Sequence, residues 1–249
     1  MFRRFALALA LLLSFAAIGA AQTVDDIVAK TIAAQGLEKM KSIQTRRLTG
    51  TMSIIPPGSP GIDGTIVIEN KRPMKTRATL TIQGTDNVQA YDGETAWSQM
   101  PVQGKPNAEP ATADDLKDLR QQADMDGELM DYKAKGHKVE LLGKESVQGT
   151  DAWKLRVTLK DGDVQYQYIE AEHFLPIKME ATRTINGAQI KTETLIGDYK
   201  DENGMMMPHS LETNVPLQPG MTVTQKVVVQ KVEFNVPIDD ARFKMPAAK

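Results

Sequence analysis

The sequence predicts a mainly β (α+β) protein built on a single strongly bent antiparallel sheet, with two amphipathic helices as its cover. Apolar and polar residues alternate along most of the chain, which is the pattern of half-buried strands. Turn-forming pairs such as Asp92-Gly93 and Asn186-Gly187 separate the alternating segments, as in a meander of roughly ten strands. Two segments show the spacing of an amphipathic helix. A sheet with one apolar face must cover that face, so the helices are expected to pack on it.

The strand prediction rests on four stretches with a clear period of two. In the first, Leu48, Gly50, Met52 and Ile54 alternate with polar residues. The same alternation recurs at residues 153–160, 177–185 and 228–236. One polar and one apolar face on each strand is typical of an antiparallel sheet that faces water on one side.

The first predicted helix covers residues 23–35, and the second runs from residue 112 to about residue 130. Each starts at a capping threonine, Thr23 or Thr112, with an aspartate three residues later. Residues 101–110, rich in proline, glycine and asparagine, are predicted to form a loop. Two short helices cover such a sheet incompletely, which favours an apolar hollow beneath them. The alternative is that the helices complete an ordinary core.

Residues 1–21 have the pattern of a secretory signal peptide. Arg3 and Arg4 precede a nearly uninterrupted apolar stretch at residues 5–18, and small residues at 19–21 permit cleavage after Ala21. The stretch is shorter than the roughly 20 residues of a membrane span, and no later stretch approaches that length. We therefore expect residues 22–249 to form one soluble domain in the periplasm.

The composition excludes several classes of protein. The chain contains 0 Cys, so we expect neither disulfides, nor cysteine-based metal sites, nor a lipid-bearing cysteine. Loss of the two arginines of the signal peptide takes the formal net charge from -2 to about -4, with both signs mixed along the chain. Such a balance argues against binding to nucleic acid, which needs a basic face.

The sequence contains no recognisable catalytic or nucleotide-binding motif, so we expect no enzyme activity, no cofactor and no metal. Gly-x-Ser-x-Gly, His-Glu-x-x-His and glycine-rich phosphate loops do not occur. The 3 histidines, His137, His173 and His209, lie far apart and are expected at the surface or at strand edges. The acidic run at 124–131 has a misplaced glycine for a calcium loop and is expected to be a solvated helix end.

Aromatic and methionine side chains are the candidates for an apolar ligand site. Trp97, Tyr166 and Tyr168 are large side chains in a chain with few aromatic residues. The two tyrosines share one strand face, so their rings either line the hollow or form an exposed ladder. Met207, in a run of three methionines, is either an adaptable ligand contact or a plain strand start.

Several short motifs occur together over nearly all of the mature chain. They are Lys71-Arg72-Pro73, Asp92-Gly93-x-Thr95-x-Trp97 with Pro101, Leu175-Pro176, Gly197-Asp198-Tyr199, and residues 204–208 and 235–246. In combination they resemble the LolA/LolB-like superfamily of lipoprotein-sorting proteins. The resemblance implies a half-barrel of roughly 10–11 antiparallel strands, covered by two or three helices acting as a lid. It also implies a cavity for lipoprotein acyl chains and no catalysis.

The resemblance further implies a role for one residue and a set of partners. Arg72 is expected to hold the lid closed through hydrogen bonds to backbone carbonyls of the lid, residues 112–130. The expected function is a periplasmic carrier of acyl chains or lipoproteins in outer-membrane lipoprotein sorting. Inner-membrane donor and outer-membrane acceptor proteins would then be its partners.

Two alternatives remain open at this point. The strands after Gly136 outnumber those a classical carrier needs, so a periplasmic envelope sensor or a protein-binding module on the same half-barrel stays possible. A hydrolase would need a histidine and a carboxylate that converge in the hollow.

Overall fold

The structure is a computed structural model that describes residues 22–185, 188–218 and 220–247. The signal peptide expected at residues 1–21 lies outside the described residues. Within the described ranges, no helix has the length and apolar character needed to cross a membrane.

One antiparallel sheet organises the structure. In the described part of the chain it contains 13 strands, in the order β6-β5-β4-β3-β2-β1-β13-β12-β11-β10-β9-β8-β7. The strands are β1 (Thr45–Ile55), β2 (Ile62–Lys71), β3 (Lys75–Ile82), β4 (Thr85–Tyr91), β5 (Ala96–Met100), β6 (Lys105–Pro110), β7 (Lys138–Val147), β8 (Thr150–Thr158), β9 (Val164–Glu170), β10 (Pro176–Ile185), β11 (Ala188–Asp201), β12 (Met206–Gln218) and β13 (Met221–Phe234). Strands adjacent in sequence are adjacent in the sheet, β1 pairs with β13, and β6 and β7 form the two edges. The single antiparallel sheet is confirmed, with more strands than the predicted 10–11.

One additional strand comes from the segment predicted to be a loop, residues 101–110. The chain forms a short 3-10 helix, η2 (Pro101–Gln103), and turns at Gly104, whose φ is 78°. It then runs back along β5, so that Pro110 lies opposite Trp97. Proline is tolerated in a strand at the edge of a sheet because no neighbouring strand needs its missing N–H.

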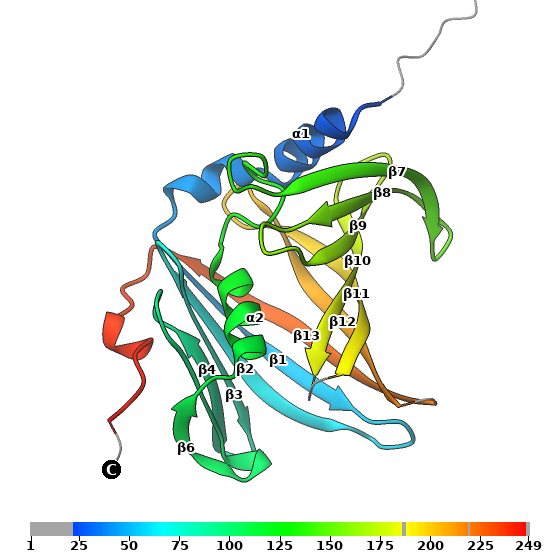
Figure 1. The fold of residues 1–249 in the computed structure, drawn as a ribbon. Helices are drawn as coiled ribbons and strands as arrows, with labels where there is room; N and C mark the ends of the chain where they lie inside the picture. The colour runs from blue at the N-terminus through cyan, green and yellow to red at the C-terminus, as the bar shows by residue number, and fades with distance from the viewer. Residues whose placement is uncertain (1–21, 186–187, 219, 248–249) are drawn as a thin grey trace, which may run out of the picture.

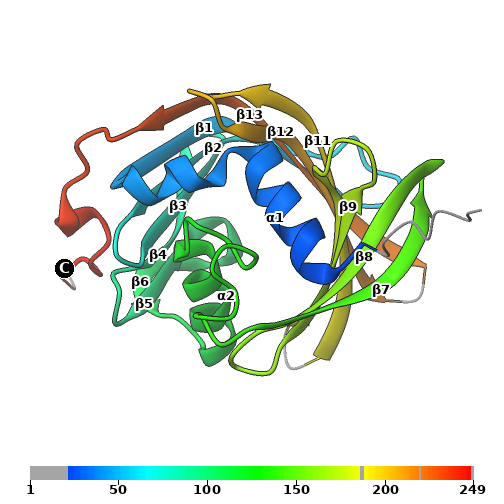
Figure 2. The same cartoon turned by 90° about the horizontal axis from the view of Figure 1, so that it is seen from above.

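The sheet twists strongly between β6 and β7 (Figure 1), and from above it forms an arc with these two edges at its ends (Figure 2). Where β1 meets β13, the register shifts between Thr49 and Gly50. A bulge of this kind increases the local bend of a sheet. At the same point a Cβ on Gly50 would lie 2.1 Å from the carbonyl oxygen of Val228, so only glycine permits the close approach of the two strands.

The helices agree with the sequence at their starts and differ at one end. Helix α1 (Val24–Gln35) has the predicted cap, in which Thr23 and Asp26 each accept a backbone N–H of the other. Helix α2 (Ala113–Ala123) is capped by Thr112 but ends earlier than predicted. Gly127 and Asp131, with φ of 69° and 53°, adopt left-handed conformations that a right-handed helix cannot include. Residues 124–130 therefore form an irregular segment, which we call the lid segment. Two more 3-10 helices are η1 (Leu37–Ser42) and η3 (Asp240–Arg242).

Both α-helices lie inside the curve of the sheet (Figure 2). Ile27 and Val28 of α1 pack on a buried cluster that includes Leu155 of β8, and α2 packs through Leu119 on Tyr91 of β4. We call the side of the sheet that faces the helices the inner face and the opposite side the outer face. The C-terminal segment covers part of the outer face with Phe243, which is fully buried.

Candidate functional site

The inner face of the central strands carries apolar side chains that remain partly accessible. On β1, Leu48 and Met52 point inward, and Met52 lies opposite Val227 of β13, which in turn lies opposite Leu211 of β12. All four side chains are half-buried. By contrast, Leu155, in the cluster beneath α1, is fully buried. The middle of the inner face is therefore apolar surface that neither helix covers completely.

A cavity of about 280 Å³ adjoins this surface, beneath η1 and the lid segment. Its apolar lining includes Met40, Met125, Met179, Met207 and Leu211. Methionine side chains are flexible and polarizable, so a wall built from them adapts to apolar groups of varied shape. The apolar part of the cavity can accept an apolar chain, and charged side chains complete its lining: Arg46, Asp124, Asp126, Glu128 and Lys178.

A second cavity, of about 480 Å³, lies beside α2 near the end of β8. Met74 and Leu159 form part of its wall, together with Lys117 of α2. Asp124 and Glu128 border both cavities. The lid segment thus contributes a wall that the two cavities share.

Arg72 ties the lid segment to η1. Its Nη1 and Nη2 donate to the two carboxylate oxygens of Asp126, at 2.9 and 2.5 Å. Its Nη2 also donates to the carbonyl oxygen of Met40 at 2.9 Å, and its Nε donates to the carbonyl oxygen of Ile43 at 2.8 Å. Hydrogen bonds from Arg72 lower the pKa of Asp126, and burial opposes this shift only partly. The sequence predicted carbonyls of residues 112–130 as acceptors. In the structure the carbonyl acceptors are instead those of Met40 and Ile43, outside that segment, and the acceptor within the segment is the carboxylate of Asp126.

Arg46 is a second arginine at the inner cavity. It lies two residues before Leu48 on the inner face of β1 and lines the cavity beneath η1. Its Nε and Nη2 donate to Oδ1 of Asn70 on β2, at 3.3 and 2.9 Å. Burial lowers the pKa of Arg46 to about 10, which leaves the guanidinium charged at neutral pH.

Of the candidates from the sequence, Met207 lies in the inner cavity and Trp97 does not. Met207 lines the cavity and packs against Met40 and Met125. Trp97 points to the outer face, where its Nε1 donates to the carbonyl of Phe243 at 2.8 Å. The indole is 2% exposed, so it is part of a packed outer core under the C-terminal segment.

The two tyrosines also lie on the outer face, but they do not form the exposed ladder that was the second alternative, because Tyr168 is buried and Tyr166 is half-buried. Tyr166 and Tyr168 pack beside Lys154, and the Tyr168 hydroxyl donates to Glu180 at 3.1 Å. Burial alone would raise the pKa of Glu180, but hydrogen bonds from Lys178 and Lys191 outweigh it and hold the value at about 2. Tyr166, Tyr168 and Glu180 thus belong to a charged and aromatic cluster on the outer side of the sheet, and none of the three lines either cavity.

The histidines occupy three different environments, and the surface prediction is wrong for one of them. His173 is exposed and His137 is half-buried, whereas His209 is 2% exposed, with Nδ1 2.9 Å from the carbonyl oxygen of Val229. Within the described residues, one group of possible metal ligands has suitable spacing, His173 with Glu170 and Glu172. Glu170 accepts the backbone N–H groups of both other residues, so the group is explained as a turn.

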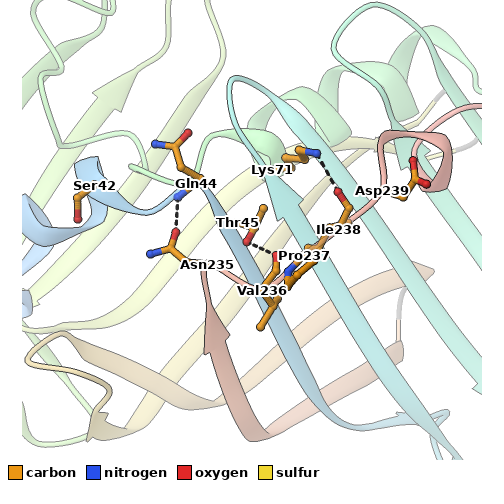
Figure 3. Close-up of a pocket in the computed structure, with 9 residues that line it drawn as sticks. All are labelled: Ser42, Gln44, Thr45, Lys71, Asn235, Val236, Pro237, Ile238 and Asp239. Carbon is orange, nitrogen blue, oxygen red and sulfur yellow. Dashed lines mark hydrogen bonds between the residues drawn. The ribbon is translucent and has the colours of Figure 1, made fainter.

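A recess of about 860 Å³ lies on the outer side, where the start of β1 meets the C-terminal segment (Figure 3). The N–H of Gln44 donates to Oδ1 of Asn235 at 2.8 Å, and Nζ of Lys71 donates to the carbonyl of Ile238 at 2.8 Å. Because these bonds join one wall of the recess to the other, we assign them the role of fastening the C-terminal segment.

Residues 65–247 match a protein family whose description is "Uncharacterized protein". The chain belongs to this family. A comparison with curated protein sequences found no match.

Solved structures with the same architecture include a LolA superfamily protein of Nitrosomonas europaea, with a TM-score of 0.61, 13% identity, and coverage of 90% of this chain and 98% of that chain. A DUF1329 family protein of Desulfovibrio piger gives a TM-score of 0.54 at 14% identity, with coverage of 88% of this chain and 97% of that chain. The domain of a putative outer membrane lipoprotein-sorting protein from Vibrio parahaemolyticus gives a TM-score of 0.53 at 12% identity, with coverage of 87% of this chain and 97% of that chain. The protein has a LolA-like fold.

The sequence patterns did not point to Arg46, Asn70 and Asp126 as site residues. A signal for Arg46 was available, because extending the alternation of Leu48, Gly50 and Met52 back by two residues puts Arg46 on the apolar face. Asp126 gave no such signal, since its role depends on the irregular lid segment that follows α2.

Proposed function

We propose that this protein is a periplasmic, non-catalytic carrier that holds acyl chains of lipoproteins or other lipids on the inner face of its sheet. The observation that carries the proposal is the half-buried apolar surface around Met52 and Val227, which continues into the methionine-lined cavity. A soluble protein ordinarily packs such a surface into its core, and an apolar surface left inside a concave fold is the usual shape of a lipid site.

The energetics suit reversible carriage. Each methylene moved from water to an apolar surface contributes roughly 0.8 kcal/mol, so a dozen contribute about 10 kcal/mol. Release of such a ligand needs a change in the site or an acceptor of higher affinity. The contact of Arg72 with Asp126 provides a point of control, because opening it would free the lid segment.

Similarity to other proteins supports a place in lipoprotein sorting. The solved structures with this fold include a LolA superfamily protein and a putative outer membrane lipoprotein-sorting protein domain. In this role the protein would be exported by residues 1–21, receive its cargo from an inner-membrane donor and deliver it to an outer-membrane acceptor.

Binding of a fluorescent fatty acid to residues 22–249 tests the proposal, with Met52→Lys and Thr51→Lys as a matched pair of variants. The two positions are neighbours on β1, both are half-buried, and they point to opposite faces. A lysine at position 52 places a charge in the apolar site, so it should weaken binding at least tenfold. A lysine at position 51 lies on the outer face and should leave binding unchanged.

Displacement by a diacylated lipopeptide then tests the cargo class. The proposal expects saturable binding of the fluorescent probe in the micromolar range or tighter, and competition by the lipopeptide. Equal weakening by both lysine variants, or binding no stronger than to a protein without a lipid site, would contradict the proposal.

A further inference from the structure

Asn70 holds Arg46 in a defined orientation at the inner cavity. The Oδ1 of Asn70 accepts from Nε and Nη2 of Arg46, while its Nδ2 donates to Oγ1 of Thr76 at 3.1 Å and to the carbonyl of Gln122 at 2.9 Å. Asn70 is fully buried, and these partners fix which end of its amide faces the arginine. The guanidinium is thereby positioned, and Nη1 is left for another acceptor.

Within the described part of the chain no carboxylate pairs directly with Arg46, and the nearby charge of Asp126 offsets the effect of burial on its pKa only in part. Among the residues that the structure describes, Arg46 forms no ion pair. Both oxygens of Asp126 are engaged by Arg72, and Asp124 pairs with Lys135. Glu128, also at this cavity, accepts a hydrogen bond from Gln167 at 3.3 Å.

Burial makes an uncompensated positive charge unfavourable, and the lowered pKa of Arg46 reflects this cost. An anion that enters the cavity relieves the cost, because an arginine offers two parallel N–H groups to a carboxylate. Arg46 is thus suited to bind an acidic group from a ligand rather than to stabilise the empty protein.

The apolar surface extends from Arg46 in one direction. Leu48, Met52 and Ile54 follow it on the same face of β1, and eight residues of strand cover roughly 26 Å. An extended long-chain acyl group is of comparable length. Arg46 therefore lies at one end of a row of apolar side chains on the inner face of β1.

We propose that the ligand is a long-chain lipid with a free carboxylate, which Arg46 binds in the cavity beneath η1 while the acyl chain lies along the inner face of β1. This inference rests on the proposed function and, of the ligands named there, selects the other lipids: fatty acids with a free acid group, in place of the ester- and amide-linked acyl chains of lipoproteins.

The test compares hexadecanoate with hexadecanol, which have the same chain length and differ in the charge of the head group. Displacement of a neutral fluorescent alcohol from the wild-type protein gives both affinities. We expect hexadecanoate to bind at least tenfold more tightly than hexadecanol. Arg46→Gln should reduce the ratio of the two affinities to less than about twofold, and Arg46→Lys should retain most of the preference.

Arg47→Gln is the control, because Arg47 is the next residue on the same strand, points to the outer face and pairs with Glu69. It should keep the full preference for hexadecanoate. Equal affinities of the wild-type protein for acid and alcohol would overturn the inference while leaving the proposed function intact. A preference that survives Arg46→Gln would overturn it as well. Failure of both ligands to bind would contradict the proposed function itself, and this comparison needs no variant to fold.

Discussion

Replacement of Arg72 by leucine should release the lid segment. The guanidinium makes four hydrogen bonds of 2.5 to 2.9 Å, two to the carboxylate of Asp126 and one each to the carbonyls of Met40 and Ile43. The side chains of Arg72 and Asp126 are 22% and 18% exposed, so water replaces the lost contacts incompletely. Arg72→Leu removes all four bonds and leaves a half-buried carboxylate without its partner.

The size of the effect follows from the kind of contact that is lost. An exposed ion pair contributes about 0 to 1 kcal/mol, and breaking a fully buried pair costs about 3 to 5 kcal/mol. This pair is intermediate in burial and is reinforced by two carbonyl acceptors, so a loss of about 2 to 4 kcal/mol is expected. Because every 1.4 kcal/mol changes an equilibrium about tenfold, the open fraction of the lid segment should rise roughly 30-fold to several hundred-fold.

Hydrogen exchange of the amides in residues 112–130 measures this opening directly. In Arg72→Leu these amides should exchange faster than in the wild-type protein, while amides of the central strands should be unchanged. Asp126→Asn should give a smaller increase, since the two carbonyl bonds of Arg72 remain. Lys200→Leu, a change at an exposed lysine of β11, is the control for an added surface leucine. Identical protection of residues 112–130 in Arg72→Leu and wild type would refute the reasoning.

Three further predictions concern stability and the histidines. The folded-state pKa of Glu180, about 2, lies below its ordinary value of 4.5, so the stabilisation is present above about pH 4.5 and is lost as the pH falls toward 2. Glu180→Gln should therefore lower the free energy of unfolding, measured in urea, by roughly 3 kcal/mol at pH 7 and by much less at pH 2. An equal loss of stability at the two pH values would contradict the role of the Glu180 charge. Gly36→Ala should lower the melting temperature more than Gly58→Ala does, because both residues have positive φ but only at Gly36 would a Cβ lie 2.3 Å from a backbone oxygen. Changing each histidine to glutamine should preserve fatty-acid binding, since none lines the cavity beneath η1, although His209→Gln should cost about 1 to 3 kcal/mol of stability.

The fold was largely predictable because its signals are local. Alternation on β1 is enough to separate Leu48 and Met52 from the polar outer residues, and the structure confirms that separation. The capping box at Thr23 and the left-handed Gly36 likewise mark both ends of α1 in the sequence. Edge strand β6 was not predicted, because its prolines are typical of a loop. Its pairing with β5 is what makes it a strand.

The site was less predictable because it depends on which face of a strand looks inward. Tyr166 and Tyr168 share a face, as the sequence indicates, but only the position of α1 on Leu155 and Ile169 shows that this face is the outer one. Trp97 similarly packs under a C-terminal segment distant in sequence. Local patterns give the period of a strand, whereas the direction of each face is a property of the whole sheet.

Photolabelling tests the central claim, that an acyl chain lies on the inner face, most directly. A long-chain fatty acid with a diazirine at its terminal carbon is irradiated on the protein, and the labelled peptides are identified by mass spectrometry. The account predicts label on inner residues of β1, β12 and β13, such as Met52, Leu211 and Val227, and loss of this label with excess hexadecanoate. Label confined to the outer face, or label that excess hexadecanoate does not displace, would contradict the account.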